Sequence, residues 1–191
     1  INISNLYTEQ AEGSNYEYFQ FVNSSILHRS DIYGKLNGVN SSCSLSGLTL
    51  SKDKQHSATY INTDHAKPHC KSSQNFKSIL NDMSSGVFNG RTVVQEDSQK
   101  TYSKQSNKNL LLSDKALMNS NPQLEIYADD VKCAHGSTTG ALDKEALFYM
   151  QSRGINKEEA SSLLIRGFAS ELINEVQHEE TKKYLLNKFD H

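Results

Sequence analysis

The feature that most constrains the fold is a series of short β-type segments, separated by polar turns, that fills the chain up to about residue 138. In the segment YEYFQFV (16–22), Tyr16 and Tyr18 fall on one face of an extended strand and Phe19 and Phe21 on the other. Because side chains alternate between the faces of a strand, and Gly, Asn, Asp and Ser favour turns, this pattern predicts an all-β region. Other segments of this type are 43–50, 57–62, 86–94, 109–112 and 123–128.

The spacing of these segments favours a parallel β-solenoid. Val87, Leu110 and Val131 begin β-type runs about 20 to 23 residues apart, a distance that suits one coil stacked on the next. Only 36% of the residues are hydrophobic and Trp is absent, which argues for a thin, layered structure rather than a thick core. The pattern alone leaves a β-sandwich or a jelly roll open.

Two local signals are ambiguous. Asn37-Gly38 and Asn89-Gly90 are typical of tight hairpin turns, but they do not bracket every pair of segments, so an antiparallel meander is not required. The segment NFKSILNDM (75–83) fits either a further strand or a helical turn.

The hydrophobic period changes after residue 140. Asp143 is placed to cap a helix that ends at Gly154, and Asn156 is placed to cap a second helix, with Glu159 three residues later. A third amphipathic piece covers 179–189. The predicted organisation is a β part, 1–140, and a small helical subdomain, 141–191, which we expect to lean on the β part or on a partner. The second helix is apolar on two flanks, formed by Ala160, Leu163, Leu164, Gly167, Phe168 and Leu172, and by Ile165, Ala169, Ile173 and Val176.

Composition excludes several classes of protein. The net charge is −2 and Lys and Arg are scattered, so no nucleic-acid surface is indicated. No apolar run approaches the ~20 residues of a membrane span, and the N-terminus INISNLYTEQ lacks the pattern of a signal peptide. We therefore expect a cytoplasmic protein without a membrane or nucleic-acid partner. Because the chain begins at Ile1 rather than Met, we expect it to be part of a longer one.

Cys133 and His135 are the strongest candidates for metal or cluster ligands. At positions i and i+2 of an extended segment, both side chains point to the same face. A thiolate and an imidazole together suit a soft metal or an iron-sulfur species. Two ligands do not close a site, so others must come from elsewhere or from a partner. On spacing alone, the stronger interpretation is structural: a buried Cys on a strand with a hydrogen-bonded His at its end.

Other candidate groups are weaker. Cys43, Cys70 and Cys133 are far apart and form neither a disulfide framework nor a CxxC pair. Asp129 and Asp130 are adjacent, so on a strand they face opposite sides, and at least one is predicted to be a turn or edge charge. Neither a GxxxxGK[ST] loop nor a GxSxG elbow is present. The loose cluster His56, His65, His69 and Cys70 matches no closed zinc pattern and is predicted to be structural.

Long segments of the chain resemble the SufB/SufD family of the SUF iron-sulfur cluster assembly system. The similarity is carried by NPQLEIYADDVKCAHGSTTGALDKEALFYMQSRGI (121–155) and EEASSLLIRGFASELINEV (158–176), and upstream by HCKSSQNFKSILNDMSSGVFNGRTVV (69–94) and QKTYSKQSNKNLLLSDKAL (99–117). SufB-like sequences tend to carry His-Glu where this chain has His135-Gly136, so it is identified with the SufD branch, as the C-terminal part of such a chain.

The resemblance implies a right-handed parallel β-helix followed by a helical subdomain. It also implies a non-catalytic scaffold role in a complex in which SufB pairs near the end of the β-helix and the ATPase SufC docks on the helices. The resemblance implies that a nascent iron-sulfur cluster forms transiently at the SufB–SufD interface, so no tightly bound cofactor is expected in this chain alone. The family histidine implicated in that step matches His135, and Cys133 matches its neighbouring cysteine. Helix residues expected to face SufC or the core are Phe148, Leu163, Leu164, Phe168 and Leu172.

Two other functions stay open at this point. A stand-alone β-solenoid enzyme or binding module for carbohydrates would need a long groove with clustered carboxylates, which the sequence does not indicate. A homodimer of this chain with no role of its own in cluster formation is the other alternative.

Overall fold

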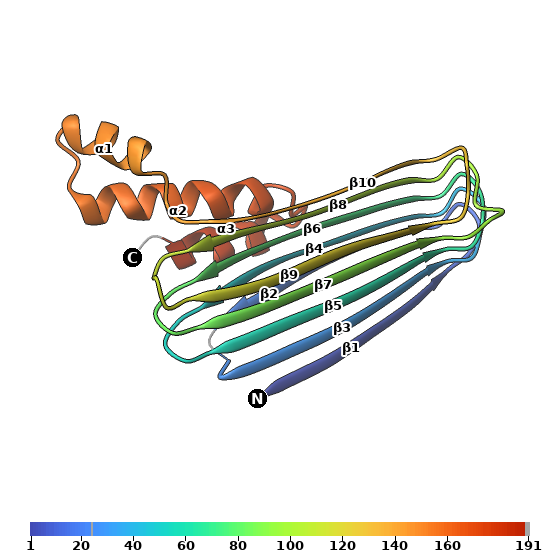
Figure 1. Cartoon of the computed structure of the whole chain (residues 1–191), viewed down its shortest axis with the longest axis horizontal. Helices are drawn as coiled ribbons and strands as arrows, with labels where there is room; N and C mark the ends of the chain where they lie inside the picture. Colours follow the sequence, from blue (N-terminus) through green and yellow to red (C-terminus); the bar gives the residue numbers. More distant parts are fainter. Residues whose placement is uncertain (24, 190–191) are drawn as a thin grey trace.

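Ten parallel strands in two facing sheets form the body of the protein (Figure 1). The computed structural model describes residues 1–23 and 25–189. Strands alternate between the sheets along the chain, so each coil contributes one strand to each sheet. The first sheet has the order β1-β3-β5-β7-β9. Its strands are β1 (Asn2–Gln10), β3 (Leu27–Leu36), β5 (His56–His65), β7 (Ser85–Val94) and β9 (Leu117–Ile126).

The second sheet has the order β10-β8-β6-β4-β2 and is paired in parallel throughout. The predicted β-solenoid is thus confirmed, and the sandwich and jelly-roll alternatives are wrong. Its strands are β2 (Asn15–Asn23), β4 (Ser42–Ser51), β6 (Lys71–Leu80), β8 (Tyr102–Leu111) and β10 (Lys132–Gly140).

The coil is longer than the predicted 20 to 23 residues. Ser57 pairs with His28 before it and with Gly86 after it, which gives a repeat of about 30 residues. The prediction was wrong because Val87 lies in β7 and Leu110 near the end of β8, so their spacing joins strands of different sheets.

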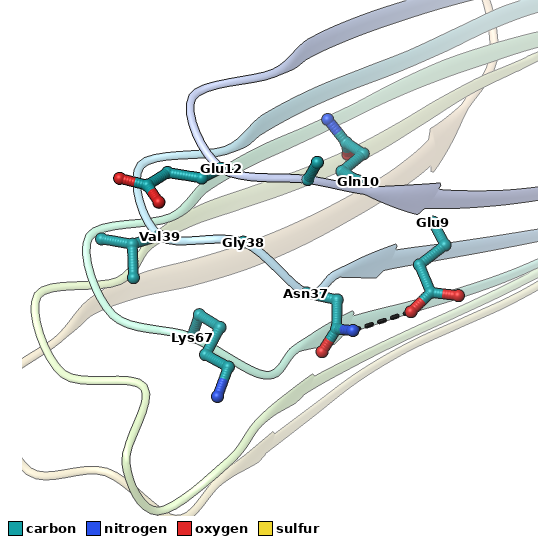
Figure 2. Close-up of a pocket in the computed structure, with 8 residues that line it drawn as sticks. Glu9, Gln10, Glu12, Asn37, Gly38, Val39 and Lys67 are labelled. Carbon is teal, nitrogen blue, oxygen red and sulfur yellow. Dashed lines mark hydrogen bonds between the residues drawn. The ribbon is translucent and has the colours of Figure 1, made fainter.

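Neither Asn-Gly pair forms a hairpin. Asn89-Gly90 lies inside β7 and pairs with β5, while 75–83 is largely the strand β6. Gly38 lies in the turn after β3, against the turn of the preceding coil (Figure 2). A Cβ at position 38 would lie 2.0 Å from the backbone nitrogen of Glu12, so glycine is required here by the close stacking of turns.

The space between the sheets is filled partly by polar side chains. At its centre, Gln74 Nε2 donates to Thr63 Oγ1 at 3.0 Å and to Thr92 Oγ1 at 3.1 Å, and Gln105 Nε2 donates to Gln74 Oε1 at 2.6 Å. These amides are buried, and buried polar groups are stable only when they are hydrogen-bonded. The low hydrophobic content thus reflects a hydrogen-bonded interior. Apolar core residues beside it are Ile32, Leu36, Leu45, Ile61, Phe76 and Phe88.

His65 makes the stability of this interior depend on pH. The ring is fully buried, and its Nε2 lies 2.8 Å from Ser72 Oγ. Burial lowers the pKa of His65 from 6.5 to about 4, against the opposing effect of Asp64. The unfolded chain therefore binds a proton near pH 6.5 that the folded chain does not bind until about pH 4.

We expect His65 to destabilise the fold as the pH falls through this window. The contribution of His65 to the free energy of unfolding is fully present above pH 6.5. About 3 kcal/mol of this free energy is lost between pH 7 and pH 4. Urea unfolding of the wild type and of His65→Gln at both pH values measures this loss. The change in unfolding free energy of the variant is subtracted from that of the wild type, which removes the effect of the other titrating groups. Equal pH dependence in the two proteins would contradict it.

The helices begin at the predicted caps. Asp143 accepts from the backbone N–H groups of Glu145 and Ala146, and Asn156 accepts from that of Glu159. Gly154 follows the first helix at a positive φ of 91°. The helices are α1 (Lys144–Ser152), α2 (Lys157–Ile173) and α3 (Glu179–Leu186), and a 3-10 turn, η1 (Asn187–Phe189), ends the described chain.

Helices α2 and α3 cover part of the outer face of the second sheet (Figure 1). Phe19 and Phe21 of β2 point outward into this layer, while Tyr16 and Tyr18 pack inside the solenoid, which confirms the two faces predicted for 16–22. Helix α1 has no buried residue and projects away from the sheets (Figure 1). The buried apolar layer consists of Leu48, Ile79 and Leu110 of the sheet and Ala169, Leu172, Ile173, Leu185 and Phe189 of the helices.

Lys77 of β6 ties α2 to the sheet. Its Nζ is buried under the helix and lies 2.6 Å from both the carbonyl oxygen of Phe168 and Oε2 of Glu171. The ammonium also lies 4.5 Å from the centroid of the Phe168 ring. Burial lowers the pKa of Lys77 and the Glu171 carboxylate opposes that shift, while Lys77 lowers the pKa of Glu171. Each charge therefore favours the ionised form of the other across this interface.

Candidate functional site

The last coil of the solenoid carries Cys133 and His135. Strands β9 and β10 are the final strands of their sheets, so each has a free edge among the described residues. Cys133 pairs with Ser103 of β8 and His135 pairs with Gln105. Because Ser103 and Gln105 are buried between the sheets, and neighbouring strands keep their side chains in register, Cys133 and His135 continue the same inward column.

This column is accessible at β10 because no further coil covers it within residues 1–23 and 25–189. Ser137 of the same strand donates a hydrogen bond of 2.7 Å to Ser120 of β9, so this face of β10 still looks across to the other sheet. Cys133 is half-buried and His135 is exposed. The structure thus places both candidate ligands on one face, at an open end of the solenoid.

The Cys133 thiol is not activated by its surroundings in this chain. Burial raises its pKa, and a backbone hydrogen bond at Ser103 offsets this in part. The thiolate is the form that binds metal or attacks sulfur. A positive charge or a metal brought by another molecule would therefore be needed to populate it at neutral pH.

The donor set is incomplete. Across residues 1–23 and 25–189, no group of three or more His, Cys, Asp and Glu side chains comes together to hold a metal ion. Iron in such clusters and soft metals take about four ligands. Cys133 and His135 supply two of them at most, so any site built on them needs ligands from another chain.

The second group of candidates is dispersed. His56 and His65 lie at opposite ends of β5, and His56 Nδ1 is 2.7 Å from Ser85 Oγ. His69 is exposed in a turn at a positive φ of 61°. Cys70 is buried, with its Sγ 3.2 Å from the carbonyl oxygen of Gly38. The structure agrees with the structural interpretation of these residues.

The two adjacent acids are turn residues. Asp129 and Asp130 precede β10, and the Asp130 carboxylate accepts a hydrogen bond from the Lys100 ammonium. The Asp130 backbone N–H donates to Gln99 Oε1 at 2.9 Å. They form no carboxylate pair suited to acid–base catalysis.

The helix residues predicted to contact a partner fall into two groups. Phe148 and Leu163 are exposed, with 74% and 45% of their surface accessible. Leu172 is fully buried in the layer between α2 and the sheet, while Leu164 and Phe168 are half-buried. In this structure only the first group presents a free apolar surface.

Neither Cys133 nor His135 lines any of five surface pockets found in the described part of the chain. Figure 2 shows one at the turns of the first coils, where Asn37 donates to Glu9 at 2.7 Å and Lys67 faces the same opening. Another lies between β6, β8 and α2, and is lined by Lys77, Lys104, Lys108, Glu171 and Glu175 among others.

The chain is a parallel β-solenoid with a small helical layer, and comparison with known proteins assigns it to a family of iron-sulfur cluster assembly proteins. Residues 1–168 match the family described as SUF system FeS cluster assembly, SufBD core domain. The chain belongs to this family, and its relatives identify it as a SufD-type member.

Three relatives illustrate the similarity. The iron-sulfur cluster assembly protein SufD of Escherichia coli (strain K12) is 40% identical over 152 residues, which is 80% of this chain and 36% of the relative. SufD of Bacillus subtilis (strain 168) is 38% identical over 109 residues, 57% of this chain and 25% of the relative. The chloroplastic protein ABCI7 of Arabidopsis thaliana is 32% identical over 186 residues, which is 95% of this chain and 38% of the relative. The chain thus spans only about a third of the length of such relatives.

No helix within the described residues is both long and apolar enough to cross a membrane.

Proposed function

We propose that the chain is a non-catalytic scaffold for iron-sulfur cluster assembly that works with SufB and the ATPase SufC. Here the cluster is cargo that forms between two chains, not a resident cofactor. The observation that carries the proposal is the position of Cys133 and His135, two soft ligands on one face of the last strand of the solenoid. A site that is half complete at an open end is suited to completion by a partner chain.

The free edge of the last coil supports pairing with SufB. A terminal strand presents unpaired backbone N–H and C=O groups, and another chain can add a strand to it. The inward face of β9 is also partly apolar, because Met118 and Leu124 are only partly buried. A partner strand here would cover this surface and bring its own ligands next to His135.

The projecting helix supports docking of SufC. Helix α1 buries none of its own residues, and Phe148 and Tyr149 expose 74% and 59% of their surface. Leu163 of α2 adds a third exposed apolar side chain. Exposed clusters of aromatic and aliphatic residues are typical of interaction sites. The proposal places the complex in the cytoplasm, without nucleic acid or membrane as a partner.

Substitution of Phe148 tests the SufC contact. In the full complex, Phe148→Ser is expected to weaken co-purification of SufC by tenfold or more, the effect of losing one aromatic contact of about 1.4 kcal/mol or more. SufB should co-purify as before. Tyr184→Ser on α3 is the matched control, since Tyr184 is a comparably exposed aromatic residue on another helix. Normal SufC binding by the Phe148 variant, or equal loss in the control, would contradict the docking surface.

Membership of the SufB/SufD family does not favour the carbohydrate alternative. A homodimer without a role in cluster assembly is distinguished from the proposal by sizing the chain with and without SufB, since only the proposal requires a mixed complex.

A further inference from the structure

Gln105 is the buried neighbour of His135 in the inward column of the second sheet. The column runs through Leu45, Gln74, Gln105 and His135, which are paired in register from β4 to β10. Gln105 is 1% exposed. It therefore lies directly behind the candidate cluster ligand, one strand further into the solenoid.

The amide of Gln105 is fixed on one side and free on the other. Its Nε2 donates to Gln74 Oε1 at 2.6 Å. Its Oε1 is buried and has no hydrogen-bond partner among the described residues. A buried carbonyl oxygen without a hydrogen-bond donor is destabilising, so this atom is an acceptor that lacks its donor.

Two further contacts hold this orientation. Gln74 Nε2 is already engaged by Thr63 and Thr92, which leaves its Oε1 as the group that faces Gln105. Gly90 lies on β7 in the facing sheet, and a Cβ at this position would lie 2.2 Å from Gln105 Nε2. The absence of a side chain at Gly90 therefore leaves room for the amide in this position.

We infer that Gln105 is a positioning residue for His135, whose imidazole N–H donates to the buried Gln105 Oε1. The reach is sufficient because Gln74 and Gln105, one strand apart in the same column, already bond to each other. His135 stands one strand beyond Gln105 at the same register position. Within residues 1–23 and 25–189 its ring nitrogens make no hydrogen bond, and the inference requires its exposed side chain to rotate so that one of them reaches the acceptor.

The bond would give His135 a defined tautomer. When one ring nitrogen donates to a carbonyl, the other keeps its lone pair for a metal, and such supporting contacts orient metal-binding histidines. The inference rests on the proposed role of His135 in cluster assembly. The hydrogen bond itself is a property of the chain alone and is tested without a cluster.

The test is the imidazole N–H resonance of His135 in a proton–nitrogen NMR spectrum of the full 191-residue chain. Exposed imidazole protons exchange with water too fast to be seen, so a visible resonance marks a hydrogen bond. We expect it in the wild type and expect Gln105→Met, which keeps the shape but removes the acceptor, to lose it. Gln20→Met is the matched control, because Gln20 is a buried glutamine on β2, at the far edge of the same sheet.

The outcomes separate the inference from its alternatives. The inference is overturned if the wild-type chain lacks the resonance or if the Gln105→Met chain retains it. The wild-type spectrum decides even if the variant fails to fold. In the complex with SufB and SufC, Gln105→Met should slow cluster loading about tenfold with Gln20→Met unaffected. If the resonance behaves as expected but loading is unchanged, the hydrogen bond stands but Gln105 does not position His135 for cluster assembly, and the role of His135 itself is decided by His135→Ala.

Discussion

His135→Ala is expected to abolish cluster assembly while SufB and SufC still co-purify with the chain. His135 is exposed on the last strand, so we expect its removal to leave the fold intact. It supplies one of the two soft donors, Cys133 and His135, on this face of β10, and a site with about four ligands loses most of its affinity when one is removed. The measurement is iron and acid-labile sulfide per complex after reconstitution with ATP.

The matched control is His69→Asn, which changes an exposed histidine in the turn between β5 and β6 and keeps a residue type that tolerates the positive φ. This variant should load clusters like the wild type. If His135→Ala disrupts the complex itself, His135 is structural and its assignment to the site is wrong. Normal loading by His135→Ala would equally contradict the assignment.

Leu172→Ala is expected to lower the free energy of unfolding by about 3 kcal/mol. Leu172 is fully buried between α2 and the sheet, in contact with the layer that contains Leu48 and Ile79. The substitution removes apolar contacts and leaves a cavity in this layer. Because Lys77 is also covered by α2, looser docking should expose its ammonium to water.

Leu163→Ala is the matched control on the same helix. Leu163 is 45% exposed, so its truncation should change the free energy of unfolding by less than about 0.5 kcal/mol. Urea unfolding of the wild type and both variants measures the difference. Equal destabilisation by the two substitutions would show that α2 does not pack on the sheet through the face that contains Leu172.

Local signals in the sequence predicted the helices and the alternation of strands. Asp143 and Asn156 mark helix starts through short-range capping bonds, and these starts are where the structure has them. Period-two alternation likewise predicted the two faces of 16–22. Such features depend on contacts within a few residues, which a single sequence records directly.

The register of the coils could not be predicted in the same way. Pairing between residues about 30 positions apart depends on the stacking of every coil, and Gln105 was missed because a glutamine within a polar segment is ordinarily exposed. The signal that could have found it is the alternation of Ser103, Gln105, Asn107 and Asn109, which are all buried along β8. The accessibility of His135 follows from its place on the last coil, which depends on the whole fold.

Cluster content of the chain alone and of its complex with SufB and SufC tests the central claim most directly. The claim is that Cys133 and His135 are half of a site that a partner completes. Iron and acid-labile sulfide, measured after identical anaerobic reconstitution with ATP, should be present in the complex and absent from the isolated chain. Two results would contradict it. One is a full cluster on the isolated chain. The other is equal cluster loading by the wild-type complex and by a complex that carries both Cys133→Ala and His135→Ala.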